Sequence, residues 1–218
     1  ITAQDANAMN NDIIVVDNKE FIGMANVKDL LKQITELKIQ NATYSNPLTF
    51  LPGNVLITQE ITQRLTDRTD FHVAYFDLND FKPFNDFYGF RQGDRAIILF
   101  SQILQKIYPS ESFIAHIGGD DFFLALNNYS VEDVYNFALS ALKEFEDSSK
   151  NLYSNEAKAN KFIITKDRYG EERKFNLLSC SCAILEISSQ SKKRNFDYTL
   201  NILKKESKCS NIPICASF

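Results

Sequence analysis

The chain has 218 residues, of which 44% are hydrophobic and 24% are charged, and its formal net charge is −4. This length and composition suit one globular domain of moderate size plus an accessory segment. The acidic balance argues against a broad basic face for nucleic acid, and no apolar run is long enough to cross a bilayer. We therefore expect a cytoplasmic protein with no nucleic-acid partner and no membrane segment in this chain.

The chain begins at Ile1, within what reads as continuing sequence, and we expect it to be part of a longer protein in which any membrane anchor lies elsewhere. The start carries no signal-peptide pattern. The four cysteines, Cys180, Cys182, Cys209 and Cys215, form no Cys-x-x-Cys pair, and the chain has only two histidines. This pattern favours buried free thiols in a reducing cytosol over a zinc site or disulfides.

Residues 1–44 differ in character from the rest of the chain. Residues 12–17 and 21–24 are predicted strands around a turn, and an amphipathic helix is predicted from Val27 to Leu37. A hairpin with a helical linker is one interpretation. The order of elements, with VVDNKEFIGMANVKDLLKQ, also resembles the second half of a CBS motif, a module usually found as a tandem pair that binds adenine nucleotides. Half a module leaves an apolar face open, so we expect it to pack on the main domain or on a second copy.

The helix is expected to continue towards Ala42 and to break at Asn46-Pro47. A helix is predicted over residues 54–65, and the short apolar run Val73–Phe76 predicts a buried central strand that delivers Asp77 at its end. A helix should then begin near Asn79 or Asp80, because Pro83 is tolerated in a first turn. Its N-terminal amides, over residues 79–82, are suited to hold a triphosphate.

Two glycines, Gly89 and Gly93, are expected to bracket a turn before an amphipathic helix over residues 94–107. Beyond it, the apolar runs 113–117 and 122–126 flank Gly118-Gly119-Asp120-Asp121, which predicts a tight hairpin. A solvated turn would use the same residues. If this hairpin neighbours the strand that ends at Asp77, three carboxylates converge at one sheet edge. Such a group repels itself unless it holds a hard divalent cation.

The last third of the chain continues the alternation of helices and strands. Ser130 is a predicted N-cap, with Asp133 reaching back to it, for a helix that extends to Phe145. Residues 147–173 are polar and predict an insertion or extended hairpin on the surface. A strand over residues 175–185, a helix over 196–205 and an edge strand over 212–215 complete the pattern.

Two of these motifs resemble a known family. Gly118-Gly119-Asp120-Asp121-Phe122 is similar to the signature of GGDEF domains, and the segment from Asp77 to Lys82, with Asn85, Gly89, Gly93 and Asp94, resembles the family's other nucleotide-binding segment. The resemblance covers roughly residues 46–218, so we expect a regulatory segment and helical linker over residues 1–44 and a GGDEF-like domain over 45–218. The implied fold is α/β (α+β) and palm-like, with a mostly antiparallel central sheet flanked by helices.

The resemblance implies a diguanylate cyclase, which condenses two GTP molecules into cyclic di-GMP and pyrophosphate with Mg²⁺ or Mn²⁺. It acts as a homodimer, because each domain holds one GTP and the two must meet. The implied metal ligands are Asp77, Asp120 and the main-chain carbonyl of Leu78, with Asp120 and Asp121 catalytic. The implied substrate-binding residues are Asn85 and Asp94 at the guanine edge, and Phe81, Lys82, Lys204 and Lys208 near the phosphates. Without the resemblance, the lysines would be interpreted as solvated surface residues, and Asn85 and Asp94 as polar residues of a helix surface or an N-cap.

The chain departs from the family pattern at several positions. Asp121 stands where the family has Glu, His116 where it has Arg, and Asn46 and Phe50 depart from the usual opening of the domain. Pro109 and Ser112 replace an inhibitory Arg-x-x-Asp, so product feedback should be absent.

These departures keep a second reading open. It is a catalytically degenerate domain that binds GTP, or nothing, and regulates an attached output domain such as a cyclic di-GMP phosphodiesterase. A third reading, an adenine-nucleotide sensor, needs the missing half of the CBS-like module.

Overall fold

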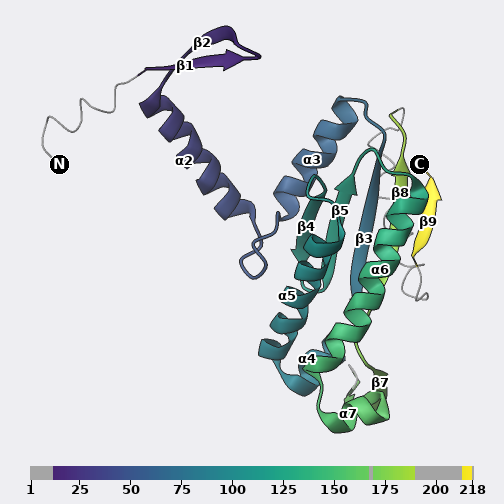
Figure 1. Cartoon of the computed structure of the whole chain (residues 1–218). Helices are drawn as coiled ribbons and strands as arrows, with labels where there is room; N and C mark the ends of the chain where they lie inside the picture. Colours follow the sequence, from purple (N-terminus) through teal and green to yellow (C-terminus); the bar gives the residue numbers. More distant parts are fainter. Residues whose placement is uncertain (1–11, 167–168, 190–212, 218) are drawn as a thin grey trace, which may run out of the picture. The chain divides into compact units, whose positions relative to one another are not determined.

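The computed structural model describes residues 12–166, 169–189 and 213–217 (Figure 1). The chain divides into two compact units, Ile1–Tyr44 and Ser45–Phe218. Among the described residues, none of the helices has the length and apolar character that a bilayer crossing needs.

The first unit is a hairpin followed by a helix. Strands β1 (Asp12–Asp17) and β2 (Glu20–Asn26) pair antiparallel, and α2 (Val27–Tyr44) follows directly. Asn18 and Lys19 both have positive φ, 48° and 72°, as a two-residue hairpin turn requires. Both strands leave large apolar side chains exposed within the described part of the chain, among them Ile14, Val16, Phe21, Ile22 and Met24. A two-stranded sheet by itself is marginal in water.

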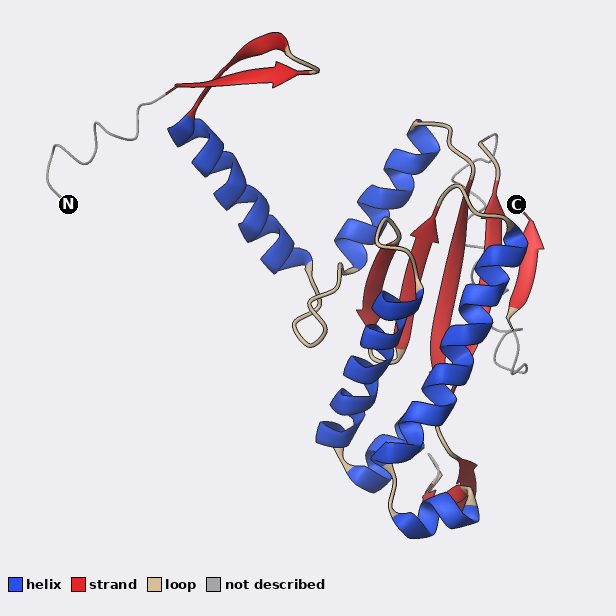
Figure 2. Cartoon of the chain, in the orientation of Figure 1, coloured by secondary structure: helices blue, strands red, loops and turns tan. Residues whose placement is uncertain are grey.

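The second unit is built on a five-stranded sheet in the order β4-β5-β3-β8-β9. The strands are β3 (Phe71–Asn79), β4 (Phe113–Gly118), β5 (Asp121–Leu126), β8 (Ser179–Ile187) and β9 (Ile214–Ser217). All neighbours are antiparallel except β8 and β9, which are parallel. The predicted palm-like architecture, mostly antiparallel with helices around it, is confirmed, and the edge position of the last strand is confirmed with it (Figure 2).

Helices cover both faces of this sheet. They are α3 (Asn54–Thr66), α4 (Phe81–Tyr88), α5 (Phe90–Ile107) and α6 (Val131–Ser149). One core cluster joins α4, α5 and α6 to the sheet and includes Phe76, Phe100 and Phe145, while the other joins α3 to Val73 and Phe123 on the opposite face. Because both faces are covered, β3 is buried almost throughout, and its apolar run Val73–Phe76 predicted this central position from the sequence.

Between α6 and β8 lie a short 3₁₀ turn, helix α7 (Asn155–Asn160) and a hairpin of β6 (Phe162–Lys166) and β7 (Glu172–Asn176). The extended hairpin predicted for this polar stretch is present. The single strand predicted over residues 175–185 is wrong, because β7 ends at Asn176 and β8 begins at Ser179. In the gap between β7 and β8, the Leu178 amide donates to the Tyr153 hydroxyl at 2.7 Å. This tertiary contact takes up the amide just after the pairing of β6 with β7 ends at Asn176.

Two further boundaries bear on the site. Ser130 and Asp133 form the predicted capping box of α6. The turn predicted between Gly89 and Gly93 is wrong, because α5 begins at Phe90 and Gly93 lies inside it. The helix predicted over residues 196–205 lies outside the described residues.

Candidate functional site

Asp77 and Asp120 line one pocket at the end of β3. Asp77 is 7% exposed and stands opposite Asp121 in the ladder between β3 and β5. The Leu78 amide donates to the Asp120 carbonyl at 3.2 Å, which fixes the hairpin turn against β3. The pocket has a volume of about 470 Å³ and is lined by Asp77, Leu78, Asn79, Asp80, Phe81, Lys82, Pro83, Asp120, Asn176 and Ser179. The two sequence motifs therefore meet in space.

The turn that carries Asp120 depends on two glycines. Gly118 has φ 143° and Gly119 has φ 60°, conformations that residues with a Cβ seldom adopt. A Cβ at either glycine would meet no atom within 4 Å, so the requirement comes from the backbone angle and not from crowding. The register shifts between His116 and Gly118, which leaves Asp120 at the tip of the turn.

Asp121 is oriented differently from the other two acids. It pairs with Asp77 across the ladder but does not line the pocket. Its side chain hydrogen-bonds the hydroxyl of Tyr75, and its Oδ1 is buried without a hydrogen-bond partner. Burial, together with this bond, raises the pKa of Tyr75, so the phenol stays protonated and donates to the carboxylate.

The start of α4 forms another wall of the pocket. Asp80 precedes the helix with φ 59°, and burial raises the pKa of its carboxyl. The side chain of Asn79 bonds Ser179 at 3.0 Å and Ser181 at 2.9 Å, which ties this corner to β8. The Lys82 ammonium is largely exposed and forms an ion pair with Asp86 at 3.0 Å. The first residues of α4 thus line the same pocket as Asp77, Asp80 and Asp120, and the amides at a helix start favour anions.

Asn85 and Gly93 are in close contact where α4 and α5 pack together. The Asn85 Oδ1 is buried and has no hydrogen-bond partner. A Cβ at Gly93 would lie 1.8 Å from that oxygen, so only glycine leaves room for the amide. Asp94, the next residue, is exposed. Sequence reasoning assigned Gly93 to a turn and missed this role, although a glycine within an amphipathic helical pattern beside Asp94 was a signal for it.

The donor groups in the pocket suit a divalent cation. Within the described part of the chain, no group of three or more His, Cys, Asp or Glu side chains is arranged to hold a metal. Mg²⁺, however, is commonly bound by one or two carboxylates and completes its shell with water and substrate phosphates. Asp77 and Asp120 supply two carboxylates, and Leu78 lines the same pocket. The residues therefore fit such an ion. Lys204 and Lys208 lie outside the described residues.

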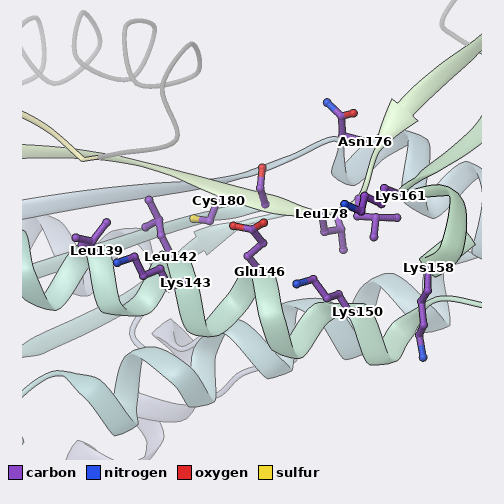
Figure 3. Close-up of a pocket in the computed structure, with 12 residues that line it drawn as sticks. Leu139, Leu142, Lys143, Glu146, Lys150, Lys158, Lys161, Asn176, Leu178 and Cys180 are labelled. Carbon is purple, nitrogen blue, oxygen red and sulfur yellow. The ribbon is translucent and has the colours of Figure 1, made fainter.

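A second, larger pocket of about 710 Å³ adjoins the first and shares Asn176 and Ser179 with it. Its lining comes from α6, from the segment of residues 150–161 that holds the 3₁₀ turn and α7, and from residues 176–180 at the start of β8 (Figure 3). Its apolar part consists of Leu139, Leu142, Leu177, Leu178 and Cys180. The charged residues around it are Lys143, Glu146, Lys150, Lys158 and Lys161. In Figure 3 the Lys158 side chain extends away from Leu178 and Cys180. No motif in the sequence pointed to this pocket.

The fold and the first, acidic pocket define a palm-like domain with a site between the central strand β3 and the Gly118-Gly119 turn. Residues 43–165 match the family described as diguanylate cyclase, GGDEF domain, and the chain therefore belongs to the GGDEF family.

Curated relatives agree with this family assignment. The chain is 33% identical over 92 residues to the diguanylate cyclase DgcP of Pseudomonas aeruginosa, a match that covers 40% of this chain and 14% of DgcP. It is 32% identical over 106 residues to the signaling protein YkoW of Bacillus subtilis, with 46% and 13% covered. The chain thus spans less than a fifth of the length of these relatives.

Among solved structures, the diguanylate cyclase SiaD of Pseudomonas aeruginosa, in complex with its activator SiaC, superposes with a TM-score of 0.59 at 18% identity, covering 88% of this chain and 69% of that one. The coiled coil and GGDEF domain of DgcB from Caulobacter crescentus, in complex with c-di-GMP, gives 0.57 at 17% identity, with 87% and 97% covered. At these identities the likeness supports the fold.

Proposed function

We propose that the second unit is a diguanylate cyclase domain that condenses two GTP molecules into cyclic di-GMP and pyrophosphate. The observation that carries this proposal is that Asp77 and Asp120, from separate motifs, line one pocket beside the start of α4. In it, Asp77, Asp120 and the Leu78 carbonyl would hold Mg²⁺ or Mn²⁺. The ion would neutralise phosphate charge and lower the pKa of the attacking 3′-hydroxyl.

The chain's own residues would bind and orient the nucleotide. The amides around Phe81 and Lys82 receive the triphosphate, and the Lys82 ammonium exchanges its ion pair with Asp86 for a phosphate oxygen. Asn85 and Asp94 hold the guanine edge, for which the unsatisfied Oδ1 of Asn85 is suited. Lys204 and Lys208 are proposed phosphate contacts from the last part of the chain. One domain holds one GTP, so reaction requires two copies.

The deciding experiment incubates the purified chain with GTP and Mg²⁺ or Mn²⁺ and measures cyclic di-GMP by mass spectrometry. Because two copies must meet, the assay is run over a range of protein concentrations, and the specific rate should rise with concentration. Asp120→Ala should abolish product while leaving the thermal unfolding midpoint close to that of the wild type. Equal product from the wild type and Asp120→Ala would contradict the proposal.

A specific observation favours a second candidate, a GGDEF domain that binds GTP without turnover and regulates an attached output domain. Asp121 is a methylene shorter than the family's Glu, and its carboxylate is bonded to Tyr75 and lies outside the pocket lining. Calorimetric titration with GTP separates the two candidates. Mg²⁺-dependent binding without product at any protein concentration supports regulation, whereas product formation by the chain excludes it.

The first unit would serve as the regulatory part. The sequence of its hairpin and helix resembles half of a CBS motif, and we propose that a complete module, in a chain that carries both halves, binds an adenine nucleotide. Titration of such a chain with AMP and ATP tests this, because binding that survives the Asp120→Ala substitution must occur outside the GTP pocket. A cytoplasmic location of the catalytic unit is part of the same proposal.

A further inference from the structure

His116 lies two residues before the Gly118-Gly119 turn, and each of its ring nitrogens is within hydrogen-bond distance of a partner. It is 2% exposed, and its ring stacks on Phe122 with centroids 4.4 Å apart and planes 7° from parallel. Its Nε2 is 3.1 Å from the Gly119 carbonyl oxygen, and its Nδ1 is 3.1 Å from Thr49 Oγ1. The imidazole therefore bridges the turn to a segment 67 residues earlier in the chain.

The two contacts define the tautomer. A carbonyl oxygen only accepts, so Nε2 must carry the hydrogen and donate to Gly119. In the neutral ring Nδ1 then accepts from the Thr49 hydroxyl, whose oxygen in turn accepts from the Leu51 amide at 3.4 Å. Burial lowers the pKa of His116, against the opposing effect of the Gly119 bond and of Asp121 and Asp120, which favours this neutral form.

On one side, this ring contacts a loop, residues 46–52, that is held together by internal hydrogen bonds. The Asn46 side chain caps the loop by accepting from the Leu48 and Thr49 amides, and the Asn46 amide donates to Leu51 at 2.8 Å. The His116 amide also donates to the Pro52 carbonyl at 2.9 Å. His116 thus joins this loop through both its backbone and its side chain.

On the other side of the ring, three carbonyl groups of the hairpin turn each accept a hydrogen bond from a different residue. The Asn54 side chain donates to the Ile117 carbonyl at 3.3 Å, His116 to Gly119, and the Leu78 amide to Asp120. Gly118 and Gly119 have backbone freedom that no side chain of their own restrains. Of these three donors, His116 is the one that reaches the middle of the turn, next to Asp120.

We propose that His116 is a positioning residue that sets the conformation of the Gly118–Asp120 turn and joins it to the 46–52 loop. The proposal rests on the proposed function, in which Asp120 binds the metal that GTP shares. It follows that a shift of the loop, which comes directly after α2 in the sequence, would change metal and GTP affinity through this ring. Loss of a residue that hydrogen-bonds to and orients a metal-binding group typically lowers metal affinity or activity by about 10- to 100-fold.

His72, the other histidine of the chain, provides a matched control. It is also buried, at 7% exposure, and lies on β3, but it stands outside the pocket lining. Neither of its ring nitrogens has a hydrogen-bond partner, and its Nε2 is 3.9 Å from Glu186. Removing either imidazole leaves a cavity, but only the loss of His116 removes bonds to the turn.

The first measurement is calorimetric titration of the full chain with Mg²⁺ and a non-hydrolysable GTP analogue. We expect His116→Ala to bind about 10- to 100-fold more weakly, and His116→Gln to bind close to wild type, because its amide can donate to Gly119 and accept from Thr49. Thr49→Val should fall between them. His72→Ala should lower the unfolding midpoint without changing affinity.

The second measurement is independent of nucleotide binding. Long-range ¹H–¹⁵N spectra should show the Nε2–H tautomer at His116, and amide shifts of Gly119 and Asp120 should move in His116→Ala and return in His116→Gln. If the wild type binds no nucleotide, the proposed function fails, but these shifts still decide the positioning role. Unmoved Gly119 and Asp120 amides in His116→Ala, or a Gln variant as impaired as the Ala variant, would overturn it.

Discussion

The two pockets of the second unit share Asn176 and Ser179 but are built in different ways. The acidic pocket takes its groups from a strand end, a hairpin turn and a helix start, positions that the backbone fixes. The larger pocket is surrounded by long side chains of helix surfaces, of which Lys150 is paired with Asp147 at 2.8 Å. Groups fixed by the backbone are preorganised for chemistry, whereas flexible ammonium groups lose conformational entropy when they bind. We therefore expect substitutions in and around the acidic pocket to have larger effects than substitutions in the larger pocket.

The largest effect should come from Asp77→Ala. This change removes one of the two carboxylates proposed to bind the cation, Asp77 and Asp120, and with it the affinity for the ion that neutralises the triphosphate. Losing several kcal/mol of charge stabilisation corresponds to a fall in the rate of cyclic di-GMP formation of roughly 10³-fold. Asp147→Ala, an exposed acid of α6, is the matched control and should keep full activity. A comparable loss in both variants would show that the comparison between the pockets is wrong.

Gly93→Ala should have the next largest effect. The added Cβ would meet the Asn85 Oδ1 at 1.8 Å, so the amide must leave its position. We expect GTP affinity to fall roughly 10- to 100-fold, as for the loss of a specific hydrogen-bonded contact. Titration with GTP and with ATP measures the effect, and the preference for guanine should shrink.

The double variant Asn85→Ala/Gly93→Ala provides the control for this prediction. Removing the Asn85 amide relieves its clash with the added Cβ at position 93. The double variant should therefore have a higher unfolding midpoint than Gly93→Ala alone, while its GTP affinity stays low. Single variants whose losses simply add in the double variant would show that the two residues act independently.

Asp121→Glu should produce a smaller change of opposite sign. The side chain gains a methylene and can extend past its present bond with Tyr75 towards Asp77. We expect turnover to rise by up to about tenfold, which corresponds to little more than 1 kcal/mol. Initial rates at saturating GTP measure it, and a fall in rate would mean that Asp121 already has the better geometry. Tyr75→Phe serves as the companion variant, because it releases Asp121 without lengthening it.

The features that the sequence predicted are those determined locally. The Ser130–Asp133 capping box and the Gly118-Gly119 turn need only neighbouring residues, and the apolar run before Asp77 indicated its buried strand. The features it missed depend on tertiary contacts. Tyr153 ends the ladder at Leu178 from 25 residues away.

The same holds within the candidate site. The orientation of Asp121 depends on Tyr75 of the neighbouring strand, which no spacing within either motif encodes. The need for glycine at position 93 arises from the packing of α5 on Asn85 of α4. The spacing of the motifs predicted that Asp77, Asp120 and Asp121 lie at one edge of the sheet. Side-chain packing determines that Asp77 and Asp120 line the pocket and that Asp121 does not.

The smallest effect should come from the larger pocket. Lys143→Ala/Lys161→Ala removes two of its ammonium groups, both on exposed side chains. Exposed substitutions usually change free energies by no more than about 0.5 kcal/mol, so kcat/KM for GTP should stay within about twofold of the wild type. The measurement is made at low and moderate salt, because screening would weaken any long-range attraction of GTP to these lysines. A fall in kcat/KM of roughly 10-fold or more at both salt concentrations would mean that the nucleotide extends past Asn176 and Ser179 into the larger pocket, and that the two pockets act as one site.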